Sequence, residues 1–320
     1  MKRYAFLIGV SVPLLISCEQ NSTNQPVAPG AAALNAFANS EWSEPIHLPA
    51  PINSSSTELG AQLSPDGLSI YVGSERAGGH GNVDIWAVRR ECVDCPWGEA
   101  VNLNINSSQS DGSAAFSPDG HLLFFSSNRD GGHGGDDIWI SYRDDTSDDQ
   151  GWQTPVNLGA GVNTNGHETG PVYVPALNAE GANIYFARGP VTGNSDIYKA
   201  LVKLDGETLG DAVPVAELNS TAAEAEPAIS HDGKEIFFHS ARTAGGFGLT
   251  DIWVATRKSP NESWSEPVNL GSNINTLAGD LTPGLSFDGR TLLWSAAAAA
   301  RTSLGRQDVW MVTRRPGRGD

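Results

Sequence analysis

Five carboxylates recur at one fixed place in this chain, and their residue type and spacing could support chemistry. Each follows six positions after the start of a triplet such as Ile52-Asn53-Ser54, and the triplets lie 53 to 57 residues apart. The five are Glu58, Asp111, Glu168, Glu224 and Asp280. Oxygen ligands of this kind suit a hard cation such as Ca²⁺. We expect either an acidic ring that binds such an ion or a partner's basic side chain, or five carboxylates that each cap a turn.

The same carboxylates could serve a hydrolase or lyase acting on saccharides, with one carboxyl as acid and another as base or nucleophile. Such chemistry needs two carboxyls in unlike environments, whereas the five are equivalent by sequence. The repeat is broken in two places. The segment "HETGPVYVPALNAEG" is longer than its equivalents and brings His167 and Tyr173, and "SAAAAARTSLGRQD" replaces a glycine loop near the end of the chain.

The elements that position these residues are five copies of one unit. In each copy a turn such as "SPDG" (64–67) precedes an apolar run, a glycine loop, a segment such as "VDIWAV", and usually a segment opening on Trp such as "WGEAVNL". Short runs rich in β-branched and aromatic residues between turns predict strands. Four strands per repeat are typical of propeller blades. The sequence predicts an all-β, five-bladed β-propeller, closed when the N-terminal strand (42–48) pairs in the last blade.

An Arg and an Asp also recur in every repeat, on either side of the glycine loop. Arg129 and Asp137 are one such pair, seven to nine residues apart in the different copies. This offset places the two side chains near one another across a hairpin, as a structural ion pair or as turn bonds. We therefore interpret these residues, and the Trp that follows each Asp, as scaffold.

These repeats, with "PDGHLLFFSSNRDGGHGGDDIW" and the "WSEPVNLG" linkers, resemble the TolB-type, WD-like β-propeller repeat family of bacterial envelope proteins. The resemblance covers residues 41–315 and implies the propeller fold. It implies little about function, because a propeller hosts binding and many chemistries alike. The α/β domain of TolB and the OmpA-like domain of some relatives have no counterpart in this sequence.

The N-terminus predicts export and a lipid anchor. Lys2 and Arg3 precede an apolar stretch that ends in "LISC", which resembles the lipobox of bacterial lipoproteins with Cys18 as the lipidated residue. We expect a signal peptide at 1–17, a flexible tether at 18–40, the propeller at 41–315 and a tail at 316–320. In an oxidising compartment Cys92 and Cys95 are expected to form a disulfide.

The net charge of the chain limits the classes of partner that it can bind. The net charge of −17 disfavours nucleic acid, whose phosphates would be repelled. The regular scaffold, the tether and the absence of a catalytic constellation in the sequence favour a monomeric, non-catalytic platform without a cofactor, held at the bacterial outer membrane only by its lipid. Such a platform would bind an envelope protein, peptidoglycan or another glycan. A saccharide-active hydrolase or lyase is the alternative.

Overall fold

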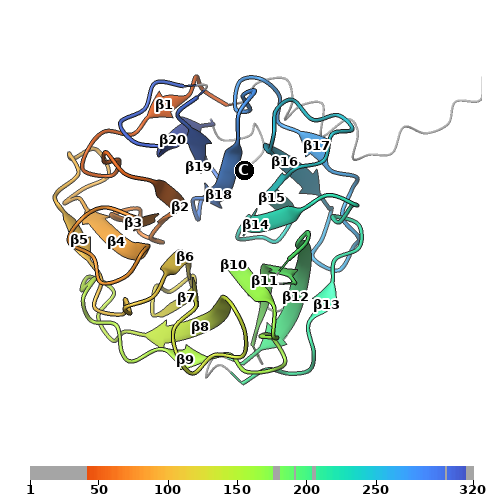
Figure 1. Ribbon diagram of the computed structural model, residues 1–320, viewed down its shortest axis with the longest axis horizontal. Helices are drawn as coiled ribbons and strands as arrows, with labels where there is room; N and C mark the ends of the chain where they lie inside the picture. The colour runs from red at the N-terminus through yellow and green to blue at the C-terminus, as the bar shows by residue number, and fades with distance from the viewer. Residues whose placement is uncertain (1–41, 176–180, 191, 204–206, 300, 315–320) are drawn as a thin grey trace, which may run out of the picture.

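The computed structural model describes residues 42–175, 181–190, 192–203, 207–299 and 301–314. Five four-stranded antiparallel sheets are arranged as blades around a central axis, so the predicted five-bladed β-propeller is confirmed (Figure 1). The expected signal peptide, tether, lipidated Cys18 and C-terminal tail lie outside the described residues. Within the described residues, no helix is long and apolar enough to span a bilayer.

The strands of each blade run in chain order from the axis outward, except in the blade that closes the ring. Blade one contains β2 (Glu58–Leu63), β3 (Ser69–Ser74), β4 (Asp84–Arg89) and β5 (Ala100–Asn102). Blade two contains β6 (Asp111–Phe116), β7 (Leu122–Ser127), β8 (Asp137–Tyr142) and β9 (Val156–Asn157). Blade three contains β10 (His167–Pro175), β11 (Ala182–Gly189), β12 (Asp196–Val202) and β13 (Val213–Pro214). Blade four contains β14 (Glu224–Ile229), β15 (Glu235–Ser240), β16 (Asp251–Thr256) and β17 (Val268–Asn269).

Blade five joins the two ends of the domain. It contains β18 (Asp280–Leu285), β19 (Thr291–Ala297) and β20 (Gln307–Thr313), and its outermost strand is β1 (Ile46–His47). Ile46 pairs with Met311, and His47 with Trp310. The N-terminal strand thus covers the edge that β20 would otherwise expose, as the sequence predicted.

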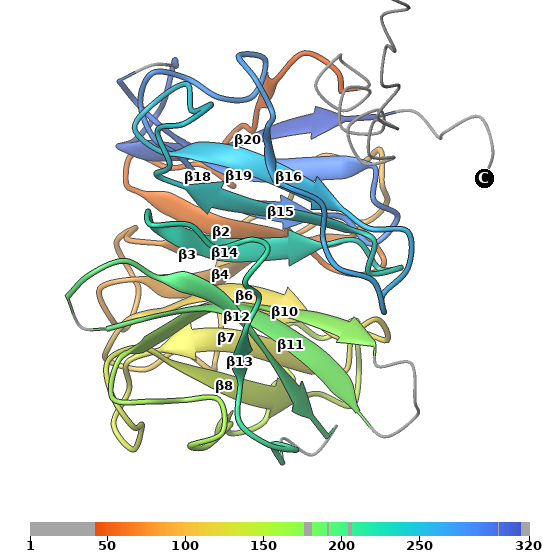
Figure 2. The same ribbon diagram turned by 90° about the vertical axis from the view of Figure 1, so that its right-hand side faces the viewer.

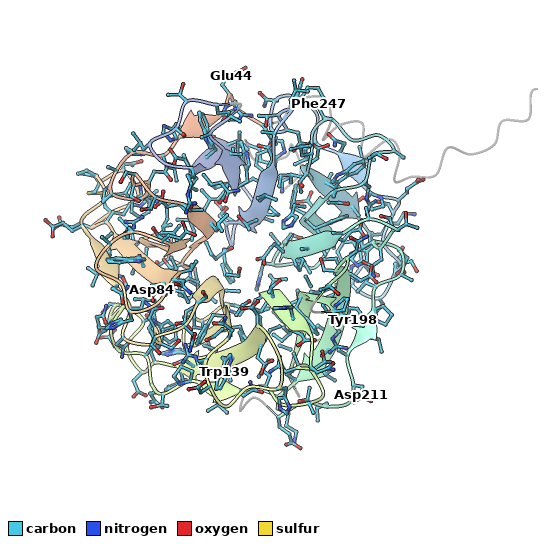
Figure 3. All side chains as sticks on the ribbon, viewed as in Figure 1. Glu44, Asp84, Trp139, Tyr198, Asp211 and Phe247 are labelled. Carbon is cyan, nitrogen blue, oxygen red and sulfur yellow. A yellow bond between two sulfur atoms is a disulfide. The ribbon has the colours of Figure 1, made fainter. Side chains whose placement is uncertain are left out.

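Apolar side chains from neighbouring blades form the core. One buried cluster joins Ile85 of blade one to Phe125 of blade two, and another joins Ile252 of blade four to Trp294 of blade five. The rings of Trp139 and Tyr198 lie over their blades, whereas Glu44 and Asp211 lie at the periphery (Figure 3). Packing between blades, rather than within one sheet, therefore holds the ring together.

The recurrent linker asparagines tie each outer strand to its own blade. Asn106 Oδ1 accepts the Ile85 backbone N–H at 2.9 Å, and Asn53 Oδ1 accepts that of Val309 at 2.7 Å across the closure. Asn163, Asn219 and Asn275 make the same bond in the other blades. This bond explains why the Asn of each triplet recurs.

The propeller has two ends, seen from the side in Figure 2. We call the end where the five innermost strands begin the carboxylate end, because each of those strands starts at or next to one of the five recurrent carboxylates. We call the opposite end the turn end, since the "SPDG"-type turns of blades one, two, four and five lie there, directly after the innermost strands. We use the word channel for the axial region that the five innermost strands surround between these two ends.

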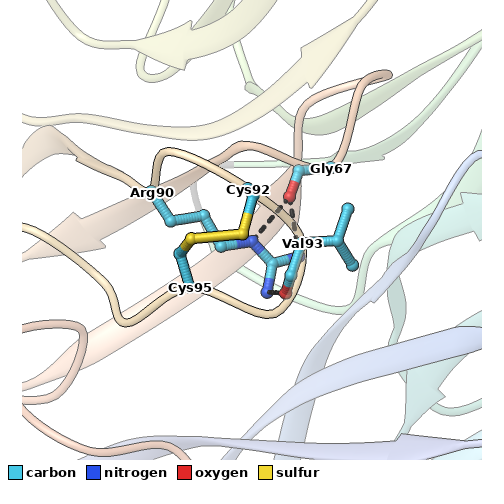
Figure 4. The surroundings of a disulfide bond; sticks show 5 residues. All are labelled: Gly67, Arg90, Cys92, Val93 and Cys95. Atoms are coloured by element: carbon cyan, nitrogen blue, oxygen red, sulfur yellow. Dashed lines mark hydrogen bonds between the residues drawn. A yellow bond between two sulfur atoms is a disulfide. The ribbon is translucent and has the colours of Figure 1, made fainter.

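A disulfide joins Cys92 and Cys95 at the turn end, where the sequence analysis expected one, with 5.0 Å between the Cα atoms (Figure 4). Arg90 braces this loop, because its guanidinium donates to the carbonyl oxygens of Gly67 and Val93. The guanidinium also stacks over the Trp97 ring, 4.3 Å from its centroid. The bridge therefore closes a short loop that covers the preceding turn.

Candidate functional site

The five recurrent carboxylates lie at the carboxylate end, but each one is buried and bonded within its own repeat. Glu58 and its four equivalents are at most 1% exposed. In every blade the Ser or Thr of the preceding triplet donates both its backbone N–H and its hydroxyl to the carboxylate, over 2.5 to 3.0 Å. These contacts are those of a turn cap. Binding of a ligand by the ring stays a prediction.

The recurrent arginines pair with these carboxylates. Arg76 lies 3.3 Å from Glu58, Arg129 lies 2.5 Å from Asp111, and the arginines of blades three and four lie 2.9 Å from their glutamates. The ion pair to the Asp across the hairpin, one of the two expected arrangements, is therefore wrong. The Arg side chain turns instead toward the preceding linker, whose carbonyls it also bonds.

Blade five departs from this pattern. Arg301 donates to the carbonyls of Asn273 and Ile274, and the indole of Trp294 donates to Asp280 at 3.1 Å. Burial, the largest effect, raises the pKa of Asp280, and its hydrogen bonds oppose that rise.

In blades one, two, four and five, the Asp across the hairpin makes the turn bonds that were the other expected arrangement. Asp84 accepts the backbone N–H groups of His80 and Gly81, and Asp137 accepts that of His133. The fourth and fifth blades repeat the contact with Asp251 and Asp308. Across the described residues, no three His, Cys, Asp or Glu side chains gather as a metal site would require. The Ca²⁺-like ion stays a prediction.

All five innermost strands share a bulge, but the residue at the bulge differs in one blade. Two residues after each recurrent carboxylate, every blade has a residue with φ between 47° and 60°, next to a shift in strand register. Blades one to three and five place Gly60, Ser113, Gly170 and Thr282 there. Blade four instead carries Glu226, a bulky acid in a position that otherwise holds small or neutral residues.

The Glu226 side chain crosses the channel toward blades two and three. A Cβ atom on Gly170 would lie only 2.6 Å from its Oε2, so the carboxyl fits because Gly170 has no side chain. Ser113 and Thr169 form hydrogen bonds with the carboxyl. Burial raises the pKa of Glu226, these hydrogen bonds oppose the rise, and the charge of Asp136 adds to it. The Glu226 carboxyl therefore keeps its proton to a higher pH than an ordinary glutamate does.

Asp136 supplies a second carboxyl in a different environment. It lies in the loop before β8, its side chain is 30% exposed, and its Oδ2 lies 2.8 Å from Nδ1 of His167. A backbone hydrogen bond also links this loop to β10, since the Glu168 N–H donates to the Asp136 carbonyl. Asp136 is thus open to solvent at the carboxylate end, while its charge still acts on the buried Glu226.

A histidine stands beside Glu226 in the same blade. His239 is the penultimate residue of β15 and pairs with Ala225. Its positional equivalents in the other blades are Gly73, Ser126, Ala187 and Ser295. The Thr282 backbone N–H donates to His239 Nδ1 at 3.2 Å. Burial lowers the pKa of His239 to about 4, so the ring is neutral at pH 7.

Sequence reasoning found His167 through the irregular third repeat but missed Glu226, Asp136 and His239. The sequence does contain a pattern that singles out Glu226. Aligning the five innermost strands on their first carboxylate shows Glu226 against Gly, Ser, Gly and Thr. Differences in segment length between the repeats mark blade three. Blade four has segments of the usual length and differs only in its side chains, so a comparison of lengths does not reveal it.

No protein-family model matches this chain, and no curated protein matches it in sequence. Solved structures with the same architecture do. An endo-arabinase from Bacteroides thetaiotaomicron is 16% identical, with a TM-score of 0.58 over 87% of this chain and 99% of that one. An α-L-arabinofuranosidase from Lactobacillus brevis is 13% identical, with a TM-score of 0.56 over 85% and 94%. A structure described as a glycoside hydrolase is 11% identical, with a TM-score of 0.60 over 90% and 96%. At these identities the likeness shows the fold.

The TolB-like propeller from Agrobacterium tumefaciens is 16% identical, with a TM-score of 0.39 over 82% of this chain and 91% of that one, which is too low to carry an argument. The β-propeller part of the family resemblance is confirmed, and the TolB-type assignment stays a prediction. The expectation of a non-catalytic platform is corrected, because the similar structures named above are glycoside hydrolases rather than scaffolds. The alternative, a saccharide-active enzyme, stays a prediction.

Proposed function

We propose that this protein is a glycoside hydrolase whose active site lies in the channel near the carboxylate end. The observation that carries the proposal is Glu226, the one acid among the five bulge positions, with a pKa raised by burial and by the charge of Asp136. Two carboxyls held in unlike environments are the arrangement that acid–base hydrolysis of a glycosidic bond requires. The glycoside hydrolases of similar fold support the proposal.

Each residue has a role that its environment suits. Protonated Glu226 donates its proton to the glycosidic oxygen, so that the departing sugar leaves as an alcohol. Asp136, exposed to solvent beside His167, stays available as the base that takes a proton from water or as the nucleophile. Ser113 and Thr169 hold the Glu226 carboxyl in position through their hydrogen bonds.

The proposal is tested by turnover of arabinosides and xylosides, both as natural oligosaccharides and as aryl glycosides with a good leaving group. Glu226→Gln keeps the side-chain shape and removes the acid. We expect kcat/KM to fall by about 10² to 10⁴-fold on natural substrates. The fall should be much smaller on activated aryl glycosides, whose leaving group needs no proton. Asp136→Asn should reduce turnover of both substrate kinds, because attack at the sugar precedes departure of either leaving group.

Glu266→Gln is the matched control, since Glu266 is exposed on the outer part of the same blade and should leave turnover unchanged. The proposal fails if the wild-type protein cleaves no saccharide on a broad panel. It also fails if Glu226→Gln loses natural and activated substrates equally, since Glu226 would then not be the acid.

A further inference from the structure

We infer that the turn end of the channel carries a second saccharide-binding site, on the opposite side of the propeller from the proposed active site. The observation is a small, partly open basin on the axis with about 30 Å³ of enclosed space, within an empty volume of about 410 Å³ that includes open solvent. Every innermost strand contributes to its wall: Gln62, Phe116, Tyr173, Ile229 and Leu285 come from β2, β6, β10, β14 and β18. The choice of ligand class rests on the proposed function.

Aromatic rings line the basin. Phe116 is buried at its base, while Tyr173 and Phe287 are half-buried. The imidazole of His231, which is exposed, lies 5.5 Å from the Phe287 ring, centroid to centroid. Half-exposed ring faces in a concave site suit the apolar C–H face of a sugar, which can pack flat against them.

Polar groups in the basin point to a neutral ligand with hydroxyls. None of the eleven lining residues is an Asp, Glu, Lys or Arg, although the chain has a net charge of −17. The Gln62 amide nitrogen donates to the carbonyls of Leu63 and Leu285, which orients the amide and leaves its Oε1 as an acceptor. Among the hydrogen bonds of the described residues, none uses this Oε1, the Tyr173 hydroxyl or the His231 ring. Three such groups at the edge of an aromatic basin match the hydroxyl edge of a sugar ring.

Tyr173 belongs to the irregular third repeat, so the wall of the basin is not the same in every blade. Burial, and to a smaller degree the charge of Asp119, raises the pKa of Tyr173, so its hydroxyl stays a neutral donor at pH 7. The equivalent turn positions of His231 and Phe287 are Pro65 and Pro118 in the first two blades. Blades three, four and five therefore supply the more exposed rings, while blade one supplies the Gln62 acceptor and blade two the buried Phe116.

Calorimetric titration of arabinotriose, xylotriose and cellotriose into the full chain tests this inference. The titration uses Glu226→Gln protein, so that ligand is not consumed. Removing the Phe287 ring with Phe287→Ala should weaken binding of at least one of these sugars about tenfold. Tyr173→Phe, which removes only the hydroxyl, should weaken it several-fold.

Tyr142→Ala is the matched control. Tyr142 is also an exposed aromatic stacked on a histidine, with 5.8 Å between its ring and that of His121, but it lies outside the basin. Its removal should change the affinity less than twofold. Circular dichroism of each variant verifies that the fold is kept.

The outcomes separate this inference from the proposed function. If wild-type protein cleaves saccharides but Phe287→Ala and Tyr173→Phe bind the trisaccharides as the parent does, the basin site is overturned and the hydrolase stands. If the basin variants lose binding while no saccharide is cleaved by the wild type, the site stands and the hydrolase falls. Failure of the parent to bind any of the three sugars overturns the basin site.

Discussion

Acidification should destabilise this protein through His239, and the size of the effect follows from its burial. The pKa of His239 falls from 6.5 to about 4 on folding because the ring is removed from water, so the folded state binds the proton less well than the unfolded chain. Stability from this group is therefore complete above pH 6.5 and is lost as the pH falls through 4. One pKa unit corresponds to 1.36 kcal/mol, which makes the loss about 3 kcal/mol by pH 4.

The perturbation that isolates this term is His239→Ser, which installs the residue that two other blades carry at the same position. Urea unfolding of the wild type and the variant, at intervals from pH 7 to pH 4, gives the difference in the free energy of unfolding at each pH. We expect that difference to shift by about 3 kcal/mol in favour of the variant as the pH falls.

Taking the difference removes the opposite contribution of Glu226. Its raised pKa means that stability is greatest below the ordinary glutamate pKa and declines as the pH rises through the raised value. That contribution is present in both proteins and cancels to the extent that His239→Ser leaves Glu226 in place. A difference that stays constant within about 0.5 kcal/mol across the range would refute the argument that His239 is buried and neutral.

Two further predictions use residues that the repeat itself matches. Arg129→Met leaves the buried Asp111 without its ion pair and should lower the free energy of unfolding by about 3 to 5 kcal/mol. Arg301→Met removes bonds to two carbonyls and a weaker attraction to Asp280, and should cost about 1 to 2 kcal/mol; equal losses in urea unfolding would contradict this. Gly170→Ala and Gly60→Ala share the strain of φ near 60°, but a Cβ on Gly170 would lie 2.6 Å from the Glu226 carboxyl and 2.7 Å from its Cα, whereas one on Gly60 would come no closer than 3.1 Å to Ser113. Gly170→Ala should therefore cost more stability in urea unfolding and reduce glycoside turnover, while Gly60→Ala should leave turnover unchanged.

Most of the fold could be predicted from the sequence because its determinants are local and repeated five times. The linker asparagines and the capped carboxylates each make the same contact in every blade, so a residue's role can be inferred from its copies. The closure of the ring followed from the missing Trp strand after β20, and β1 fills that place.

The partner of the recurrent Arg could not be predicted in the same way. Arg129 is eight residues from Asp137 and eighteen from Asp111, and sequence distance favoured the nearer acid. Asp137 is already engaged with the backbone of its own glycine loop, so the Arg turns to the buried carboxylate, where its charge offsets the cost of burial. Proximity along the chain gave the wrong partner because backbone donors had taken the nearer acid.

The hydrogen bonds and ion pairs of the recurrent carboxylates also explain why the proposed active site lies at the bulge of blade four. The recurrent carboxylates are occupied by caps and, in four blades, by arginines, so they stabilise every blade alike and leave little for a substrate. The bulge positions do not stabilise the blades in this way, because four of the five hold Gly, Ser or Thr. A blade can therefore change its residue there without losing a cap or a core contact. Blade four has used that freedom for Glu226, and it also departs from the other blades at His239 on the neighbouring strand β15. In a scaffold of equivalent blades, unlike environments for two carboxyls can arise only where one blade departs from the rest, and the proposed chemistry depends on that departure.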